Sequence, residues 1–161
     1  MLTLNRGKDM FNVLFVCTEN TCRSPMAQYI FNHLTKNMGI KGAKATSAGL
    51  VARENGKMAE NAKKALKEID VKTHFKPKTV TLDMLNKADI VICMTIKHKV
   101  ELALKFNYLE KLTTFSELVG GEDIADPYGG NLAVYENTAN VIYKNCVLLI
   151  RKLIKEGKIN V

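Results

Sequence analysis

A cysteine and an arginine stand close together in residues 17–24, which read Cys-Thr-Glu-Asn-Thr-Cys-Arg-Ser. A deprotonated cysteine is a strong nucleophile, and an arginine guanidinium holds two oxygens of a phosphate group with a planar pair of donors. Ser24 carries a hydroxyl that can donate a hydrogen bond to the thiolate of Cys17. These residue types predict a phosphate-binding loop in which Cys17 is the nucleophile and Arg23 binds the phosphate.

The elements on either side of this loop suit anion binding. Residues 11–16 are an apolar, β-branched run that predicts a buried strand, and Ser24-Pro25 predicts a helix start with the serine as N-cap. The loop therefore lies between the carboxyl end of a strand and the N-terminus of a helix. There, unpaired amide N–H groups and the helix dipole both attract a dianion. The same positive field favours the thiolate form of Cys17.

The rest of the chain alternates predicted strands and helices. Strands are predicted at residues 45–50, 89–94 and 111–115, and helices at residues 58–69, 82–87, 97–106 and about 133–156. Residues 89–94 are apolar on both faces, as expected at the centre of a parallel sheet covered by helices. The alternation predicts an α/β fold, with right-handed crossovers around a small parallel sheet and helices on both of its faces. We expect one domain over residues 11–161 and a disordered extension over residues 1–10.

Composition favours a single cytoplasmic domain. The 161 residues are 47% hydrophobic and 25% charged, which suits one globular core. No run approaches the roughly 18 apolar residues of a membrane span, and residues 1–10 lack the apolar centre of a secretory signal, so no membrane contact is predicted. The net charge of +8 comes from scattered lysines, which either form solvated helix faces or attract an anionic partner. No aromatic and basic cluster accompanies the charge, so no nucleic-acid partner is predicted.

The cysteines predict reduced thiols rather than a disulfide scaffold, because the four are irregularly spaced. Cys93 and Cys146 fall within a predicted strand and a predicted helix, which favours core packing. Cys22 is either a small loop residue or a redox partner, whose disulfide with Cys17 would protect the nucleophile from irreversible oxidation. Neither a metal nor a cofactor is predicted, because no second ligand pair accompanies the loop cysteines. The isolated histidines are expected at the surface or its boundary: His33, His74 and His98.

Three segments together resemble the low-molecular-weight protein tyrosine phosphatases. They are residues 17–25, Ser47-Ala48-Gly49 and Asp126-Pro127-Tyr128, which occur in matching order within residues 11 to about 153. The resemblance implies a four-stranded parallel sheet, no metal and a phosphocysteine intermediate formed by Cys17. It also makes Asp126 the general acid that protonates the leaving group and then the base that activates water. The competing interpretation of residues 126–130 is an ordinary turn.

The resemblance extends to the residues around the nucleophile. It makes Arg23 the phosphate clamp and Ser24 the donor to the thiolate, with Asn20 bracing the loop partly through Ser47. The substrates it implies are phosphorylated proteins, and the product is inorganic phosphate. The residues expected to contact substrate are Thr18, Glu19, Asn20, Thr21, Cys22, Ser24 and Tyr128.

Two threonines separate this chain from the phosphotyrosine-specific pattern. Family members acting on phosphotyrosine have leucine and isoleucine where this chain has Thr18 and Thr21, and a second aromatic residue in place of Gly129. These features resemble instead the bacterial protein-arginine phosphatase branch. A threonine suits a polar guanidinium better than an aryl ring, whose flat faces need apolar walls. We therefore predict phosphoarginine ahead of phosphotyrosine as substrate. Further segments carry the same resemblance: Met26-Ala27, Asn55-Gly56-Lys57 and Met94-Thr95.

Glu19 departs from the family, which has glycine at this position. A carboxylate close to a bound dianion repels it unless the side chain turns to solvent, and a positive φ would strain a non-glycine residue. We therefore expect Glu19 to reduce phosphate affinity.

Two further functions stay open from the sequence. One is an arsenate reductase, which would need two further closely spaced cysteines on a mobile segment. The second is a phosphate-binding module that has lost turnover, in which Glu19 would be the residue responsible for the loss. A monomer is the default expectation.

Overall fold

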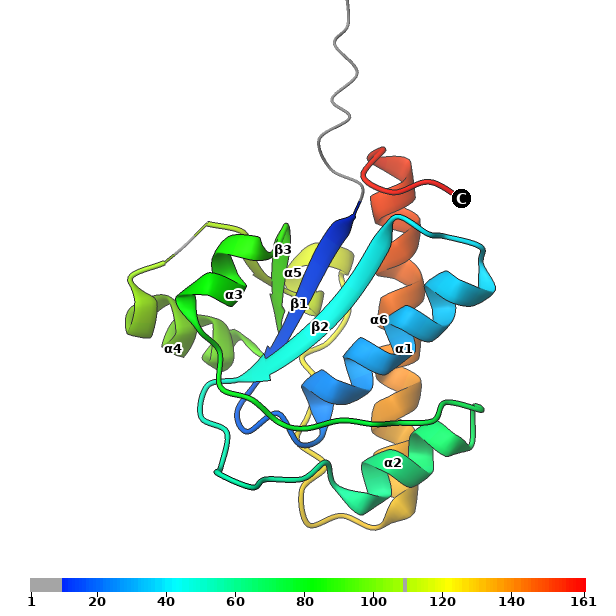
Figure 1. Ribbon diagram of the computed structural model, residues 1–161. Coiled ribbons are helices and arrows are strands. Elements are labelled where there is room, and N and C mark those ends of the chain that lie inside the picture. Colours follow the sequence, from blue (N-terminus) through cyan, green and yellow to red (C-terminus); the bar gives the residue numbers. More distant parts are fainter. Residues whose placement is uncertain (1–9, 109) are drawn as a thin grey trace, which may run out of the picture.

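A four-stranded parallel sheet organises the computed structural model, which describes residues 10–108 and 110–161 (Figure 1). The strands are β1 (Phe11–Cys17), β2 (Ala43–Gly49), β3 (Ile90–Cys93) and β4 (Leu112–Thr114), in the order β2-β1-β3-β4. β1 is central and pairs with β2 from Phe11 to Cys17 and with β3 from Val13 to Val16. The nucleophile predicted from the sequence is thus the last residue of a central strand.

Helices cover both faces of the sheet. They are α1 (Arg23–Asn37), α2 (Glu60–Lys67), α3 (Leu82–Lys87), α4 (Ile96–Phe106), α5 (Phe115–Val119) and α6 (Leu132–Lys155). α1, α2 and α6 pack together beside one face, whereas α3 and α4 lie on the other (Figure 1). The predicted α/β fold with a four-stranded parallel sheet is therefore confirmed.

Side chains of β1 alternate between two hydrophobic clusters, as the two-residue period of a strand requires. Val13 and Phe15 join the larger cluster with α1 and α6, where Phe15 lies against Phe31 with ring centroids 6.1 Å apart. Leu14 and Val16 join the smaller cluster under α3 and α4. Because both faces are buried, the strand is fixed in register and its end is held at a defined place.

The ends of several elements differ from the sequence-based predictions. α1 begins at Arg23, and its N-cap is Cys22 without a side-chain hydrogen bond, so the prediction of Ser24 as the cap is wrong. The predicted strand at residues 111–115 ends at Thr114, and the unpredicted helix α5 follows it. Of the predicted extension, residues 1–9 lie outside the described residues. Within residues 10–108 and 110–161, no helix has the length and apolarity to cross a membrane.

Candidate active site

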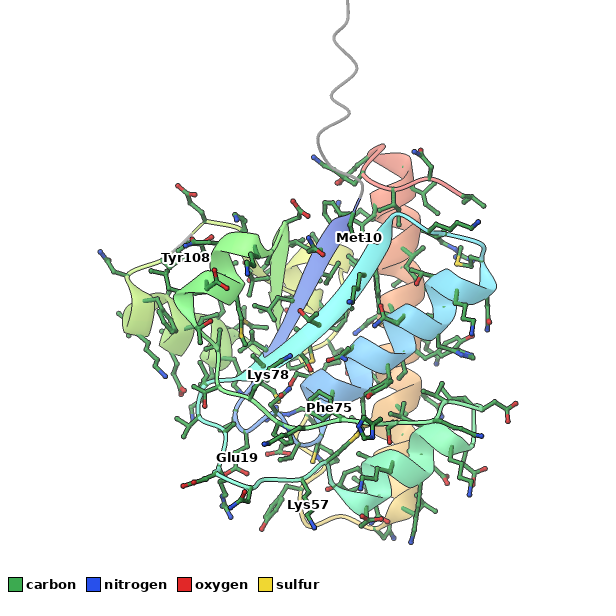
Figure 2. All side chains as sticks on the ribbon, in the orientation of Figure 1. Met10, Glu19, Lys57, Phe75, Lys78 and Tyr108 are labelled. Atoms are coloured by element: carbon green, nitrogen blue, oxygen red, sulfur yellow. The ribbon has the colours of Figure 1, made fainter. Side chains whose placement is uncertain are left out.

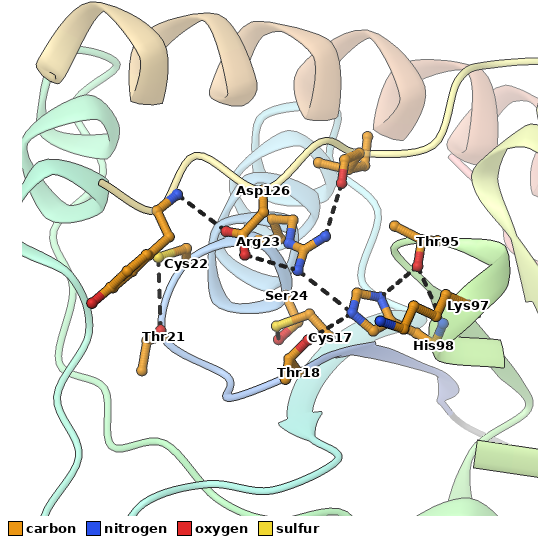
Figure 3. Close-up of polar contacts among 12 residues, drawn as sticks. Cys17, Thr18, Thr21, Cys22, Arg23, Ser24, Thr95, Lys97, His98 and Asp126 are labelled. Carbon is orange, nitrogen blue, oxygen red and sulfur yellow. Dashed lines mark hydrogen bonds and ion pairs between the residues drawn. The ribbon is translucent and has the colours of Figure 1, made fainter. Parts of the chain in front are cut away.

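The loop between β1 and α1 forms one wall of a cavity of about 260 Å³. The buried Sγ of Cys17 lies 2.9 Å from Oγ of Ser24, so this hydroxyl contacts the sulfur, and the carbonyl oxygen of Ala48 at 3.4 Å, instead of capping the helix (Figure 3). The N-terminus of α1 points toward the same place, and its unpaired amides favour an anion there. The cavity is lined by Cys17, Thr18, Glu19, Thr21, Cys22, Arg23, Arg53, Asp126 and Tyr128.

Asn20 holds the loop in shape from inside. It is fully buried and has a φ of 61°, a left-handed conformation that asparagine tolerates better than most residues. Its Nδ2 donates to Oγ of Ser24 at 2.8 Å and to Oγ of Ser47 at 3.0 Å. Its Oδ1 accepts the backbone N–H of Lys78 at 3.1 Å. The loop is therefore tied to α1, to β2 and to the segment before α3.

The end of β2 packs directly against the backbone of the loop. A Cβ at Gly49 would lie 2.8 Å from the carbonyl carbon of Glu19 and 2.8 Å from the carbonyl oxygen of Thr18. Any side chain at Gly49 would displace the loop, which explains the glycine that ends the Ser47-Ala48-Gly49 segment.

Arg23 is buried under the cavity and held by three groups. Its Nη1 donates to the carbonyl oxygen of Ile124 at 3.0 Å, and its Nη2 lies 3.5 Å from Nε2 of His98. The same Nη2 lies 3.5 Å from Oδ2 of Asp126, whose Oδ1 accepts the backbone N–H of Tyr128 at 3.1 Å. The side chain of Asp126 is 55% exposed, so its carboxylate faces the open side of the cavity. The structure thus brings Arg23 and Asp126 together in the cavity that Cys17 also lines.

His98 is a site residue that the sequence analysis missed, and its prediction as a surface or boundary histidine is wrong. It is 4% exposed and lies in the first turn of α4, whose N-cap is Thr95. Burial, followed by the charge of Arg23, lowers the pKa of His98 to about 4. The spacing of Thr95 and His98 is that of an N-cap and a first-turn residue. This motif signals a helix start after the strand, whereas the contact of His98 with the loop depends on the strand order.

Glu19 forms an ion pair with Arg53 at the rim of the cavity. Nε of Arg53 lies 3.1 Å from Oε1 of Glu19, and the side chains are 77% and 36% exposed. Figure 2 shows Glu19 near the end of the sheet where β1 and β2 finish. The residue of the loop with a positive φ is Asn20, so the expected strain of a positive φ does not arise at Glu19. Arg53 is a second cavity residue that the sequence analysis missed.

The remaining cysteines are buried. Sγ of Cys22 lies 3.6 Å from the hydroxyl of Tyr135, and burial raises the pKa of Cys22. Burial also raises the pKa of Cys93, to about 12, and that of Cys146. Both of these thiols are fully buried, which confirms their prediction as core residues.

The three remaining predicted contact residues, Thr18, Thr21 and Tyr128, all line the cavity. Thr18 is exposed, Thr21 is half-buried and Tyr128 is 78% exposed. In the part of the chain that the structure describes, no cluster of three or more His, Cys, Asp or Glu side chains could hold a metal ion.

The chain is similar to known proteins over most of its length. A family described as low molecular weight phosphotyrosine protein phosphatase matches residues 12–159. A protein-arginine-phosphatase of Bacillus subtilis (strain 168) is 35% identical over 150 residues, which cover 91% of this chain and 97% of the relative.

Two solved structures are similar over most of their length. A YwlE arginine phosphatase mutant with a phosphorylated active-site serine has a TM-score of 0.87 and 33% identity, covering 92% of this chain and 99% of the other. A low molecular weight protein tyrosine phosphatase from T. tengcongensis has a TM-score of 0.84 and 41% identity, covering 89% of this chain and 99% of the other.

Proposed function

Since the chain belongs to the low molecular weight phosphotyrosine protein phosphatase family and is a protein phosphatase, we propose that its preferred substrate is phosphoarginine in proteins. In this proposal Cys17 is the nucleophile, Arg23 is the phosphate clamp and Asp126 is the general acid and base. Ser24 and Asn20 hold the sulfur and the loop in place, and Ser47 supports Asn20.

The polar mouth of the cavity is the observation that carries this substrate preference. Beside Cys17 the lining offers the hydroxyl of Thr21 and two carboxylates, that of Glu19, paired with Arg53, and that of Asp126, paired with Arg23. A guanidinium is planar and cationic and presents several N–H donors, which hydroxyl and carboxylate oxygens accept. An aryl ring needs apolar walls, and the mouth supplies one aromatic side chain, the exposed Tyr128. The hydroxyl of Thr18 lies 2.8 Å from Nε2 of His98 and that of Thr21 lies 3.7 Å from Sγ of Cys22, and each oxygen can still accept a hydrogen bond from substrate.

The proposed reaction has two chemical steps. The thiolate of Cys17 attacks phosphorus while the carboxylic acid of Asp126 protonates the leaving guanidine nitrogen, which gives phosphocysteine and an unmodified arginine. The carboxylate of Asp126 then takes a proton from water, which attacks phosphorus, and inorganic phosphate and the Cys17 thiolate are released. Donation from Ser24 at 2.9 Å stabilises the sulfur when it carries charge.

Purified protein assayed on matched phosphoarginine and phosphotyrosine peptides tests the proposal. We expect the larger kcat/KM on phosphoarginine, and Cys17→Ser abolishes turnover of both. Thr21→Ile replaces the hydroxyl by apolar bulk and lowers the ratio of the two kcat/KM values about tenfold. A parent protein that prefers the phosphotyrosine peptide would overturn the phosphoarginine proposal.

Phosphotyrosine is the second candidate substrate, favoured by one observation. Tyr128 stands at the mouth with 78% of its surface exposed, where its ring can stack on an aryl group. An arsenate reductase relay has less support, because Cys93 and Cys146 are fully buried and offer no accessible partner to Cys17. A phosphate-binding module without turnover would bind phosphate tightly and leave an aryl phosphate unhydrolysed, so the same assays detect it.

We also propose that the protein acts as a monomer in the cytoplasm, without a nucleic-acid or membrane partner. The proposed chemistry needs a reduced Cys17, which the cytoplasm maintains. Sedimentation of the purified protein tests the oligomeric state, and a dimer at assay concentration would contradict it.

A further inference from the structure

His98 lies in α4, on the opposite face of the sheet from α1, and contacts both Arg23 and the loop. Its Nε2 lies 2.8 Å from Oγ1 of Thr18 and 3.5 Å from Nη2 of Arg23, and its Nδ1 lies 3.0 Å from Oγ1 of Thr95 (Figure 3). The imidazole is thus in contact with the loop, with the clamp and with the N-cap of its own helix.

The partners of His98 fix its protonation. A guanidinium has only donors, so Nε2 accepts from Arg23 and carries a lone pair. The hydroxyl of Thr18 then donates to the same nitrogen. The ring proton lies on Nδ1 and is donated to Oγ1 of Thr95, which also accepts the backbone N–H of His98 at 3.2 Å. The pKa of about 4, lowered by burial and by Arg23, keeps this ring neutral at physiological pH.

We propose that His98 is a positioning residue for phosphate binding, which orients the Arg23 guanidinium through Nε2 and couples it to Thr18 of the loop. The inference rests on the clamp role proposed above for Arg23. An arginine side chain has large rotamer freedom, and fixing it before phosphate arrives lowers the entropy lost on binding.

A neutral side chain is suited to orienting the Arg23 guanidinium. The second side-chain partner of Nη2 is the carboxylate of Asp126, which attracts Arg23 but also repels a phosphate dianion. His98 orients the same guanidinium without cancelling its charge. The carbonyl oxygen of Ile124, which accepts from Nη1 at 3.0 Å, is likewise uncharged. Two neutral acceptors therefore hold the guanidinium while its positive charge stays available to phosphate.

A pair of amide substitutions separates positioning from packing. Glutamine at this position can place its Oε1 close to the position of Nε2, whereas the shorter asparagine cannot reach Arg23. We expect His98→Asn to raise the inhibition constant of inorganic phosphate about tenfold. KM for para-nitrophenyl phosphate should rise by a similar factor, and kcat should change less. His98→Gln stays within about threefold of the parent, because the acceptor is retained. His33→Gln, which changes a histidine outside the site, leaves the constants unchanged.

Thermal unfolding of each variant shows whether the variant is folded. If both His98 variants unfold, Thr18→Val serves instead, since it keeps the side-chain shape and removes one donor to Nε2. It should raise the phosphate inhibition constant about threefold. Equal constants for His98→Asn, His98→Gln and the parent would overturn the inference, as would an unchanged constant in a folded Thr18→Val.

Arg23→Lys distinguishes failure of this inference from failure of the proposed function. Lysine loses the planar pair of donors, and we expect a phosphate inhibition constant raised at least about tenfold. If Arg23→Lys has this effect and the folded His98 variants do not, only the positioning role fails. If Arg23→Lys leaves the constant unchanged, the clamp role fails and the inference fails with it.

Discussion

Oδ2 of Asp126 lies 3.5 Å from Nη2 of Arg23, so the proposed general acid and the proposed phosphate clamp are paired with each other. A phosphate dianion that binds Arg23 must therefore compete with the carboxylate. The pair is open to solvent on the Asp126 side, where the side chain is 55% exposed, so the competition is weak enough to be overcome.

Asp126→Asn should separate binding from catalysis. We expect kcat on a phosphoarginine peptide to fall at least about 100-fold, because the amide neither donates an acidic proton nor accepts one from water. The inhibition constant of inorganic phosphate should fall about threefold, because the competing charge is gone. Steady-state kinetics with phosphate as inhibitor measures both. Weaker phosphate binding in the variant would show that the ion pair does not compete with phosphate.

The Glu19–Arg53 ion pair modifies the expectation that Glu19 weakens phosphate binding. Glu19→Gly removes a negative charge at the rim and leaves Arg53 free to attract the dianion. We expect the phosphate inhibition constant to fall about threefold at low salt and the gain to shrink at high salt. Arg53→Ala is the matched control, since it leaves the carboxylate unpaired and should raise the constant. Unchanged or poorer binding in Glu19→Gly would contradict the prediction.

The neutral state of His98 makes the fold sensitive to acid. Between pH 6.5, the ordinary pKa of histidine, and about 4, its pKa in the fold, only the unfolded chain binds a proton at His98. Acid therefore favours unfolding, and the free energy of unfolding should fall by up to about 1.4 kcal/mol for each pH unit in this window. The stabilisation is fully present above pH 6.5.

Urea unfolding at several pH values measures this dependence. The nearby charges that oppose or assist it are Arg23 and Lys97, which lower the pKa of His98, and Asp123 and Asp126, which raise it. His98→Gln should have a shallower pH dependence than the parent, whereas His33→Gln should retain the parental slope. Identical slopes in the parent and His98→Gln would refute the prediction.

The cysteines should differ sharply in reactivity. The pKa of Cys93 is about 12, and burial also raises the pKa of Cys22 and Cys146, so these thiols are protonated near neutral pH. We expect iodoacetamide at about pH 7.5 to modify the folded protein at Cys17 alone, and all four cysteines after denaturation. Peptide mass spectrometry identifies the sites. Rapid labelling of Cys22 in the folded protein would contradict its raised pKa and favour a redox role for this thiol.

The catalytic loop could be predicted from the sequence because its determinants are contiguous. Cys17, Arg23 and Ser24 lie between a recognisable strand and a recognisable helix start, so residue type and local spacing suffice. The same spacing nevertheless predicts Ser24 as the helix cap, because its type alone does not show that its hydroxyl faces the sulfur at 2.9 Å. Local pattern identifies the elements, whereas the use of a particular hydroxyl depends on packing.

His98 and Arg53, which the sequence analysis missed, are brought to the site by the tertiary structure. His98 comes close to Thr18 because β3 lies beside β1, a neighbourhood set by strand order rather than by sequence distance. Arg53 reaches Glu19 from the segment after β2. The missed helix α5 did have a local signal, since Thr114 and Glu117 have the spacing of a capping box, and Oγ1 of Thr114 accepts the backbone N–H of Glu117.

The bonds of Asn20 also determine when the enzyme can become active during its synthesis. Its amide requires Ser47 and the backbone of Lys78, and the clamp further requires the carbonyl of Ile124. A nascent chain that has emerged only as far as α1 therefore lacks the contacts that hold the loop and Arg23 in place. Phosphatase activity should arise only after most of the polypeptide has left the ribosome, with no partly active precursor before that.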